Sequence, residues 1–245
     1  MRVRGDRAPS TTAAPPPPGL GVGASGPAVT DLQQRLVDLR YDLPEVNGTF
    51  GPATQQAVYA FQKVNGMART GRATDDVLAR IAAASIPPLM VPGAGGTHAE
   101  IDVARQVLFF VKAGSLFKIV PISTGSGQRF CVDGRCSTAV TPGGAFRVYG
   151  KYRGWQNGNL GKLYSPSYFN GGIAVHGYPS VPVRPASHGC VRVPMRIADY
   201  WHTLVKKGDP VYVDGTTAAT VQSPDRKSTR LNSSHMSESR MPSSA

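Results

Sequence analysis

One short stretch, residues 176–192, holds residues that could carry out nucleophilic chemistry. Cys190 is the one cysteine with no second cysteine nearby, and it directly follows a Ser-His-Gly run that contains His188. A thiol attacks as its thiolate, and a neighbouring imidazole can accept its proton. His176, upstream in the same stretch, is a second candidate for that base. The sequence therefore predicts a cysteine nucleophile paired with a histidine base.

Glycine lies beside both reactive groups, since Gly177 follows His176 and Gly189 precedes Cys190. Glycine allows a sharp backbone turn, so the N–H groups of Gly189 and Cys190 could face a developing oxyanion. The same residue types could also bind zinc, but zinc normally needs a third or fourth protein ligand. The nearest spare ligand is His202. We therefore expect neither a metal nor another cofactor.

The stretch resembles the active-site signature of the L,D-transpeptidases, the YkuD-type enzymes that cross-link bacterial peptidoglycan. Their pattern is His-Gly or His-Ser, a loop, and then Ser/Thr-His-Gly-Cys, which matches His176-Gly177 and residues 187–190. The loop is short here, and Arg192 stands where many members carry asparagine. The resemblance implies that Cys190 takes the acyl group of a donor stem peptide as a thioester and releases D-alanine. The amine of a neighbouring stem's diamino acid then resolves the thioester.

The resemblance also implies roles for the residues around the thiol. His176 would be the general base, with its second ring nitrogen held by the carbonyl of Gly177, and His188 would support the site or be structural. Gly189 and Cys190 would supply the oxyanion hole. An arginine can bind a substrate carboxylate through two hydrogen bonds. The residues expected to contact the substrate are Ser187, Arg192, Tyr168 and Trp155.

Two alternative functions remain open beside the transpeptidase. The thioester could be resolved by water, which would make the protein an L,D-carboxypeptidase. The chain could also be a catalytically inactive protein that binds the cell wall, although the intact Cys190 and His176 argue against this.

Residues 27–83 have the pattern of three short helices, with apolar side chains at helical spacing and Asn-Gly and Gly-Pro breaks between them. The run LQQRL…NGTFGPATQQAVYAFQ…G resembles the peptidoglycan-binding domain 1 family. Most matching residues belong to the predicted core, so the sequence assigns no wall-binding residue. The matching positions are Leu32, Gln33, Asn47, Gly48, Phe50, Gly51, Thr54, Ala57, Val58, Phe61, Gln62 and Gly66.

Residues 99–215 change to short runs of β-branched and aromatic residues separated by turns, with one helix around residues 194–206. This predicts a mostly-β sandwich, and with the helical bundle an α+β multidomain protein. Residues 1–26 and 84–98, rich in proline and glycine, are predicted linkers.

Two further cysteines, Cys131 and Cys136, enclose an Asp133-Gly134 pair that is typical of a tight hairpin turn. Cysteines that flank such a turn can come within disulfide reach. We expect a bridged hairpin in an oxidising compartment, with Cys190 left as a free thiol.

The charge and the apolar pattern of the sequence limit which classes of partner are expected. The formal charge is +12 and the sequence pI about 10.0, which favours an anionic partner. The basic residues are scattered, not clustered with aromatic residues, so an anionic cell wall is expected and nucleic acid is not. No run of eighteen apolar residues is present, so no membrane span is expected. No signal peptide is visible either, and an extracytoplasmic protein would need its export signal upstream.

Residues 216–245 are predicted to be a tail outside any fold. One codon choice for residues 225–235 matches a common sequencing-library adapter, and residues 238–245 fit the distal part of that adapter. We therefore interpret residues 225–245 as a translated assembly artefact. Without them the natural chain would carry about +10.

Overall fold

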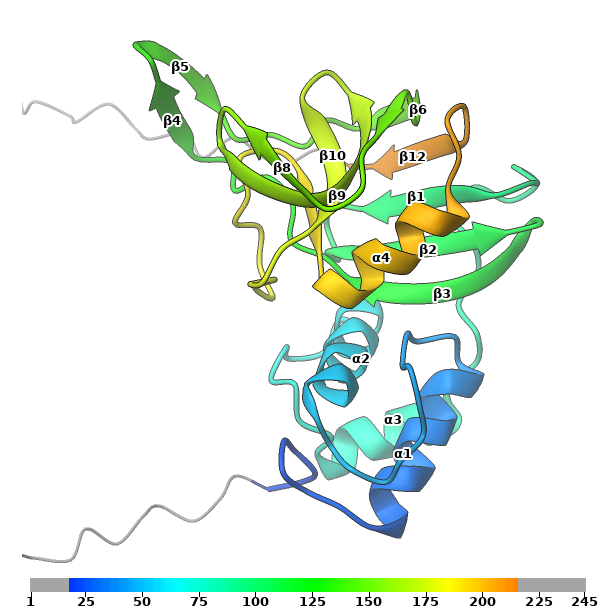
Figure 1. Ribbon diagram of the computed structural model, residues 1–245. Helices are drawn as coiled ribbons and strands as arrows, with labels where there is room; N and C mark the ends of the chain where they lie inside the picture. The colour runs from blue at the N-terminus through cyan, green and yellow to red at the C-terminus, as the bar shows by residue number, and fades with distance from the viewer. Residues whose placement is uncertain (1–17, 216–245) are drawn as a thin grey trace, which may run out of the picture.

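The computed structural model describes residues 18–215, which form a helical module packed against a β-sandwich (Figure 1). The predicted tail, residues 216–245, lies outside the described residues. Three helices form the module, and the rest of the described chain contains twelve strands, ten of them in the sandwich, and a fourth helix. The predicted α+β class, with a three-helix module preceding a mostly-β domain, is confirmed.

The helices of the module begin where the sequence breaks predicted. Proline at a first helical position has the right backbone angle and lacks only an N–H that would be unpaired there. α1 and α2 both begin in this way, and α3 carries two aspartates in its first turn, which favour the positive end of the helix dipole. The helices are α1 (Pro27–Asp38), α2 (Pro52–Val64) and α3 (Asp75–Ala83).

The module begins earlier than the sequence predicted. Leu20 forms a β-bridge with Ala73, and Ser25 forms one with Thr49. The predicted linker over residues 1–26 is therefore wrong for residues 18–26, because these pair with the loops between the helices. Residues 1–17 lie outside the described residues.

Two five-stranded sheets form the sandwich. The first has the order β3-β2-β1-β12-β6, and the second has the order β11-β10-β9-β7, with β8 also paired to β9. The strands of the first sheet are β1 (His98–Asp102), β2 (Val107–Lys112), β3 (Ser115–Pro121), β6 (Gly144–Arg147) and β12 (Pro210–Asp214). Those of the second are β7 (Gly150–Lys151), β8 (Trp155–Gly158), β9 (Gly161–Asn170), β10 (Ile173–Gly177) and β11 (Val191–Val193).

The core of the sandwich lies between the two sheets and is closed by helix α4 (Met195–Leu204). Ile197, Ala198 and Trp201 of α4 are buried in this core with strand residues of both sheets. α4 contacts β9 and β10, so it supports the strand that carries His176. His98 belongs to β1, so the predicted connector over residues 84–98 ends one residue too late.

The outer face of the first sheet is covered by the helical module, which explains the uninterrupted apolar run at residues 107–111. Side chains alternate between the two faces of a strand. Leu108 and Phe110 are buried in the sandwich core, whereas Val107 and Phe109 are buried in a second core with α1, α2 and α3. A strand that is covered on both faces loses the polar alternation of a half-exposed strand.

The module also protects an open edge of this sheet. Tyr41 forms a parallel bridge with Ile119 of β3, and Asp42 N–H donates to the Ile119 carbonyl at 2.9 Å. The carboxylate of Asp42 accepts from the guanidinium of Arg196 and from the hydroxyl of Tyr200, both on α4. An edge strand exposes unpaired backbone groups. The module therefore extends the first sheet of the sandwich as well as packing on it.

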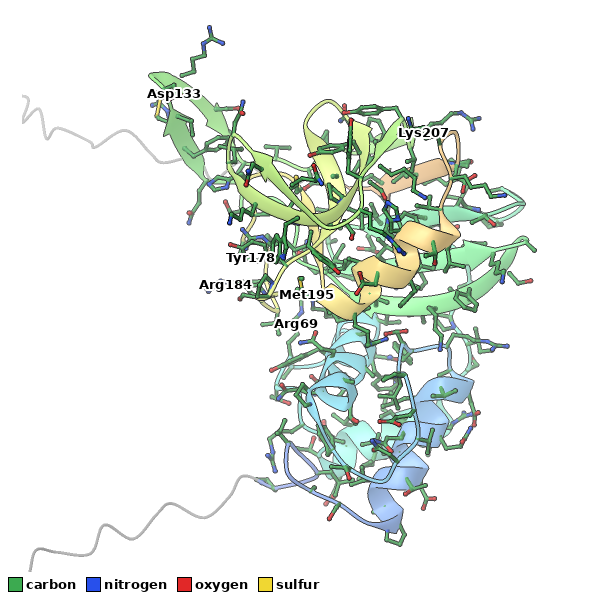
Figure 2. The ribbon with its side chains drawn as sticks, viewed as in Figure 1. Arg69, Asp133, Tyr178, Arg184, Met195 and Lys207 are labelled. Carbon is green, nitrogen blue, oxygen red and sulfur yellow. A yellow bond between two sulfur atoms is a disulfide. The ribbon has the colours of Figure 1, made fainter. Side chains whose placement is uncertain are left out.

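A separate two-stranded sheet, β4 (Arg129–Val132) and β5 (Arg135–Thr138), projects from the sandwich (Figures 1 and 2). Asp133 and Gly134 form its turn, and both have positive φ angles, 49° and 75°. Cys131 and Cys136 face each other across the hairpin and are joined by a disulfide. Both the bridge and the turn match the expectation from the sequence.

Candidate active site

The two reactive residues lie on neighbouring parallel strands. β10 ends with His176-Gly177, and Cys190 directly precedes β11, whose Arg192 is the register partner of His176. Parallel strands need a long crossover connection. Residues 178–186, here called the crossover loop, make this connection with no helix, and residues 187–190 form the turn that follows.

His176 is held in one orientation by its own strand. Its side chain is almost fully buried, and ring Nδ1 lies 2.9 Å from the carbonyl oxygen of Gly177. A carbonyl can only accept, so Nδ1 carries the proton and Nε2 has a lone pair. Burial, with a smaller contribution from the charge of Arg192, lowers the pKa of His176 to about 4. The imidazole is therefore neutral at neutral pH, which is the form that accepts a proton.

Gly177 has a second role beside His176. A Cβ at this position would come within 2.9 Å of the Cβ of Ala198 on α4 and within 3.0 Å of the ring of Tyr164. Glycine therefore allows α4 to pack closely against the strand that carries the histidine.

Cys190 is a free, half-buried thiol. Its Sγ lies 3.6 Å from the carbonyl oxygen of Gly172, in the turn between β9 and β10. Burial raises the pKa of Cys190, although a backbone hydrogen bond from Ala174 and the charge of Arg192 act in the opposite direction. With a raised thiol pKa and a lowered imidazole pKa, the resting pair is thiol and neutral histidine.

The turn before Cys190 is fixed by Ser187 and Gly189. Ser187 Oγ donates to the Cys190 carbonyl at 2.5 Å and accepts from Gly189 N–H at 3.0 Å. Gly189 has a φ of 136°, and a Cβ there would lie 2.8 Å from the carbonyl oxygen of Val140. Ser187 is buried and its hydroxyl is occupied within the turn, which indicates a structural role, although the residue also lines the cavity of Cys190.

One hydrogen bond bears on the oxyanion hole predicted from Gly189 and Cys190. The Gly189 N–H donates to Ser187 Oγ and therefore does not face a substrate in this structure. The backbone N–H of Cys190 remains the candidate donor.

His176, Cys190 and Arg192 line one cavity of about 210 Å³. The guanidinium of Arg192 lies over the ring of Tyr178, 4.3 Å from its centroid. This contact orients Arg192 at the cavity wall. Seven further lining residues come from the β8–β9 turn and from strand ends, where no sequence motif marks them. They are Leu160, Gly161, Lys162, Leu163, Gly172, Ile173 and Tyr178.

The three remaining predicted residues lie at the margin of this site. His188 lines the cavity but is exposed, and its ring packs edge-on against Phe130 of the β4–β5 hairpin at 4.8 Å. Tyr168 lines a neighbouring hollow with Tyr149 and Tyr152 that shares Gly172 with the cavity, and the charge of Cys190 contributes to raising the pKa of Tyr168.

Trp155 is half-exposed on β8 and packs edge-on against Tyr164. Neither Trp155 nor Tyr168 lines the cavity of Cys190. Within residues 18–215, no group of three His, Cys, Asp or Glu side chains could hold a metal ion.

The pH dependence of Cys190 alkylation tests the neutral resting pair. Because the thiol pKa is raised, the thiolate population grows only above the ordinary thiol range. The rate of iodoacetamide labelling should therefore keep rising through pH 9. Cys131 and Cys136 are bridged and do not react. A rate that was constant from about pH 5 to pH 8 would indicate a preformed thiolate–imidazolium pair and contradict this account.

Comparison with known proteins places both parts of the chain. Residues 96–213 match the YkuD family, the L,D-transpeptidase catalytic domain, and residues 25–81 match PG_binding_1, a peptidoglycan binding domain. No curated protein gives a match.

Several solved structures are similar to this chain. The L,D-transpeptidase of Xylanimonas cellulosilytica is 38% identical with a TM-score of 0.76, over 82% of this chain and 100% of that one. An L,D-transpeptidase of Stackebrandtia nassauensis is 24% identical with a TM-score of 0.47, over 82% of this chain and 98% of that one. The chain belongs to the L,D-transpeptidase family, with a YkuD-type catalytic domain that follows a peptidoglycan binding module.

Proposed function

We propose that this protein is a peptidoglycan L,D-transpeptidase that works through a thioester on Cys190. The observation that carries the proposal is the orientation of His176. Its Nδ1 is bound by the Gly177 carbonyl, so Nε2 has its lone pair available in the cavity that Cys190 also lines.

In the first half of the reaction, His176 takes the proton of the Cys190 thiol as sulfur attacks the carbonyl carbon of the peptide bond before the terminal D-alanine. The Cys190 N–H stabilises the oxyanion. The C–N bond then breaks, and His176 returns the proton to the departing amine of D-alanine. A thioester between Cys190 and the donor stem remains.

In the second half, the side-chain amine of a neighbouring stem attacks the thioester carbonyl. His176 accepts the proton of the attacking amine and gives it to the departing thiolate. A new peptide cross-link forms and Cys190 returns as a thiol. His176 starts and ends each half neutral, which is the form that its lowered pKa keeps populated at neutral pH.

Two cations at the cavity suit a peptidoglycan stem. Arg192 and Lys162 both line it. Stem peptides carry free carboxylates, and Arg192, which is oriented by Tyr178, can bind one of them. This electrostatic match supports a peptide carboxylate as substrate.

Release of D-alanine from a soluble tetrapeptide stem tests the function. The purified protein should release D-alanine, and intact-mass analysis should show an adduct of the tripeptide acyl group on Cys190. Added acceptor stem should convert the product to a cross-linked dimer. Hydrolysis with no dimer would assign the protein as an L,D-carboxypeptidase, and no adduct at all would contradict the proposal.

The helical module is proposed to bind the cell wall, as its family match implies. Co-sedimentation with purified sacculi, with and without a competing fragment of the module, measures this binding. We expect the full chain to sediment with sacculi and a soluble fragment of the module to compete for binding. If the full chain remained in the supernatant at low salt, the module would have no wall-binding role.

Action on peptidoglycan places the proposed site of function outside the cytoplasm, and the Cys131–Cys136 disulfide is consistent with such a compartment. None of the helices within residues 18–215 is long and apolar enough to cross a bilayer.

A further inference from the structure

The crossover loop that joins His176 to the Cys190 turn has few hydrogen-bond donors of its own. Proline occupies positions 179, 182 and 185, so every third residue lacks a backbone N–H. Such a stretch cannot satisfy its carbonyls by pairing with itself. The carbonyls of Val183 and Arg184 accept hydrogen bonds from side chains elsewhere in the chain.

One of these two donors comes from the catalytic domain and the other from the helical module. Ser123 Oγ donates to the Arg184 carbonyl at 2.8 Å. Arg69, in the loop between α2 and α3, donates to the Val183 carbonyl at 2.6 Å and to the Arg105 carbonyl at 3.3 Å. Figure 2 shows Arg69 at the end of the module nearest the sandwich, close to the loop that carries Arg184.

Arg69 is itself held in place by its module. Gln62 of α2 is fully buried, and its side-chain amide donates to Thr70 Oγ1 and to the Arg72 carbonyl, both at 3.0 Å. The amide oxygen of Gln62 accepts from Gly71 N–H at 2.9 Å. Three hydrogen bonds therefore fix the residues directly after Arg69, so its guanidinium extends from a rigid base.

The module also makes hydrogen bonds with the segment of the sandwich that contacts the end of the crossover loop. Lys63 is buried, and its Nζ donates to the carbonyls of Gln106 at 3.1 Å and Ile122 at 2.9 Å. The side-chain amide of Gln106 makes two hydrogen bonds with Thr124. Its nitrogen donates to Thr124 Oγ1 at 2.6 Å, and its oxygen accepts from the Thr124 backbone N–H at 2.9 Å. The Thr124 carbonyl accepts from the backbone N–H of Ala186 and of the residue that follows, both at 2.9 Å.

We propose that Arg69 is a positioning residue for the reaction at Cys190: by holding the Val183 carbonyl, it makes the peptidoglycan binding module a structural part of the active site. The proposal rests on the transpeptidase function proposed above. Arg69 does not touch the cavity. It acts through the crossover loop, which fixes the position of Cys190 relative to His176.

The expected effect is catalytic because acyl transfer depends on the placement of the reacting groups. A misplacement of about 1 Å can cost about 100-fold in rate. Without Arg69 the Val183 carbonyl loses its hydrogen bond, while Ser123 still holds the Arg184 carbonyl. The crossover loop should then move by part of such a distance. We therefore expect Arg69→Ala to lower kcat for D-alanine release about tenfold or more, with a smaller change in KM.

The test compares three variants on a soluble tetrapeptide donor, which separates catalysis from wall binding. Arg69→Lys keeps the charge but has no planar fork to reach two carbonyls, so it should fall between Arg69→Ala and the parent protein. Arg80→Ala is the matched control, because Arg80 is an exposed arginine of the same module whose side chain donates to Asn65 of that module. It should keep the parent kcat.

Hydrogen–deuterium exchange gives a second readout that needs no activity. Arg69→Ala should speed amide exchange in residues 180–187 and leave exchange in the β1–β2–β3 sheet unchanged. An unchanged kcat with unchanged loop exchange would overturn the proposal, and so would uniformly faster exchange with a lower Tm, which indicates a general stabilising role. If the parent protein released no D-alanine but the loop still loosened, the function would be wrong and the structural coupling right.

Discussion

Cys190→Ala is expected to abolish D-alanine release, with a loss on the order of 10⁴–10⁶-fold. Without the sulfur no thioester can form, and the reaction has no covalent route to the cross-link. The fold should survive, because Cys190 is half-buried at the wall of a cavity, and the removed atom leaves no closed void. The measurement is D-alanine release together with intact mass after incubation with the donor stem.

The matched control removes the other two sulfur atoms. Cys131→Ala with Cys136→Ala should still give one acyl adduct, because these residues lie on the projecting hairpin. Cys190→Ser should be almost as inactive as Cys190→Ala, since a hydroxyl beside a base with a low pKa ionises far less readily than a thiol. An acyl adduct on Cys190→Ala would show that the nucleophile is another residue.

The parts of the site predictable from sequence were those set by local backbone chemistry. His176 and Gly177 are adjacent, so the histidine ring can donate a hydrogen bond to the Gly177 carbonyl without help from any distant segment. The structure has this hydrogen bond. The Asp133-Gly134 turn likewise determines the hairpin and brings its two cysteines together. In both cases the interacting groups lie within a few residues of each other.

The parts that sequence reasoning could not place depend on side-chain rotamers and on how neighbouring strands pack. Gly189 was expected to face the substrate, but whether its N–H does so depends on the rotamer of Ser187, which takes that hydrogen bond. Trp155 and Tyr168 share an aromatic-rich stretch, but Trp155 packs on Tyr164, whereas Tyr168 lines a hollow that adjoins the cavity at Gly172.

The packing of the helical module on the sandwich was not predicted from the sequence, for a related reason. The run at residues 107–111 was interpreted as a strand, although its lack of polar alternation also indicated cover on both faces. Lys63 gave no signal at all, because a lysine on a short amphipathic helix is normally solvated. Its burial against two carbonyls follows only from the docking of the module on the sheet.

His176→Ala is expected to lower the rate of D-alanine release by about 10²–10⁴-fold, the usual contribution of a general base. The rate of Cys190 alkylation near neutral pH should fall as well, because no neighbouring imidazole then accepts the thiol proton. The parent protein should lose activity only as the pH falls towards about 4, where His176 becomes protonated, and not near the ordinary histidine pKa. The sign follows from burial, which favours the neutral ring.

Two further variants separate the base from other histidines. His202→Ala removes the same ring from α4, outside the cavity, and should leave the rate almost unchanged. His188→Ala removes an exposed ring that packs on Phe130 and should cost far less than His176→Ala. If His188→Ala gave the larger loss and His176→Ala left alkylation unchanged, the base would be His188. Because His176 and Cys190 act in one step, the double variant should be little worse than Cys190→Ala alone, and additive losses would mean that they act in separate steps.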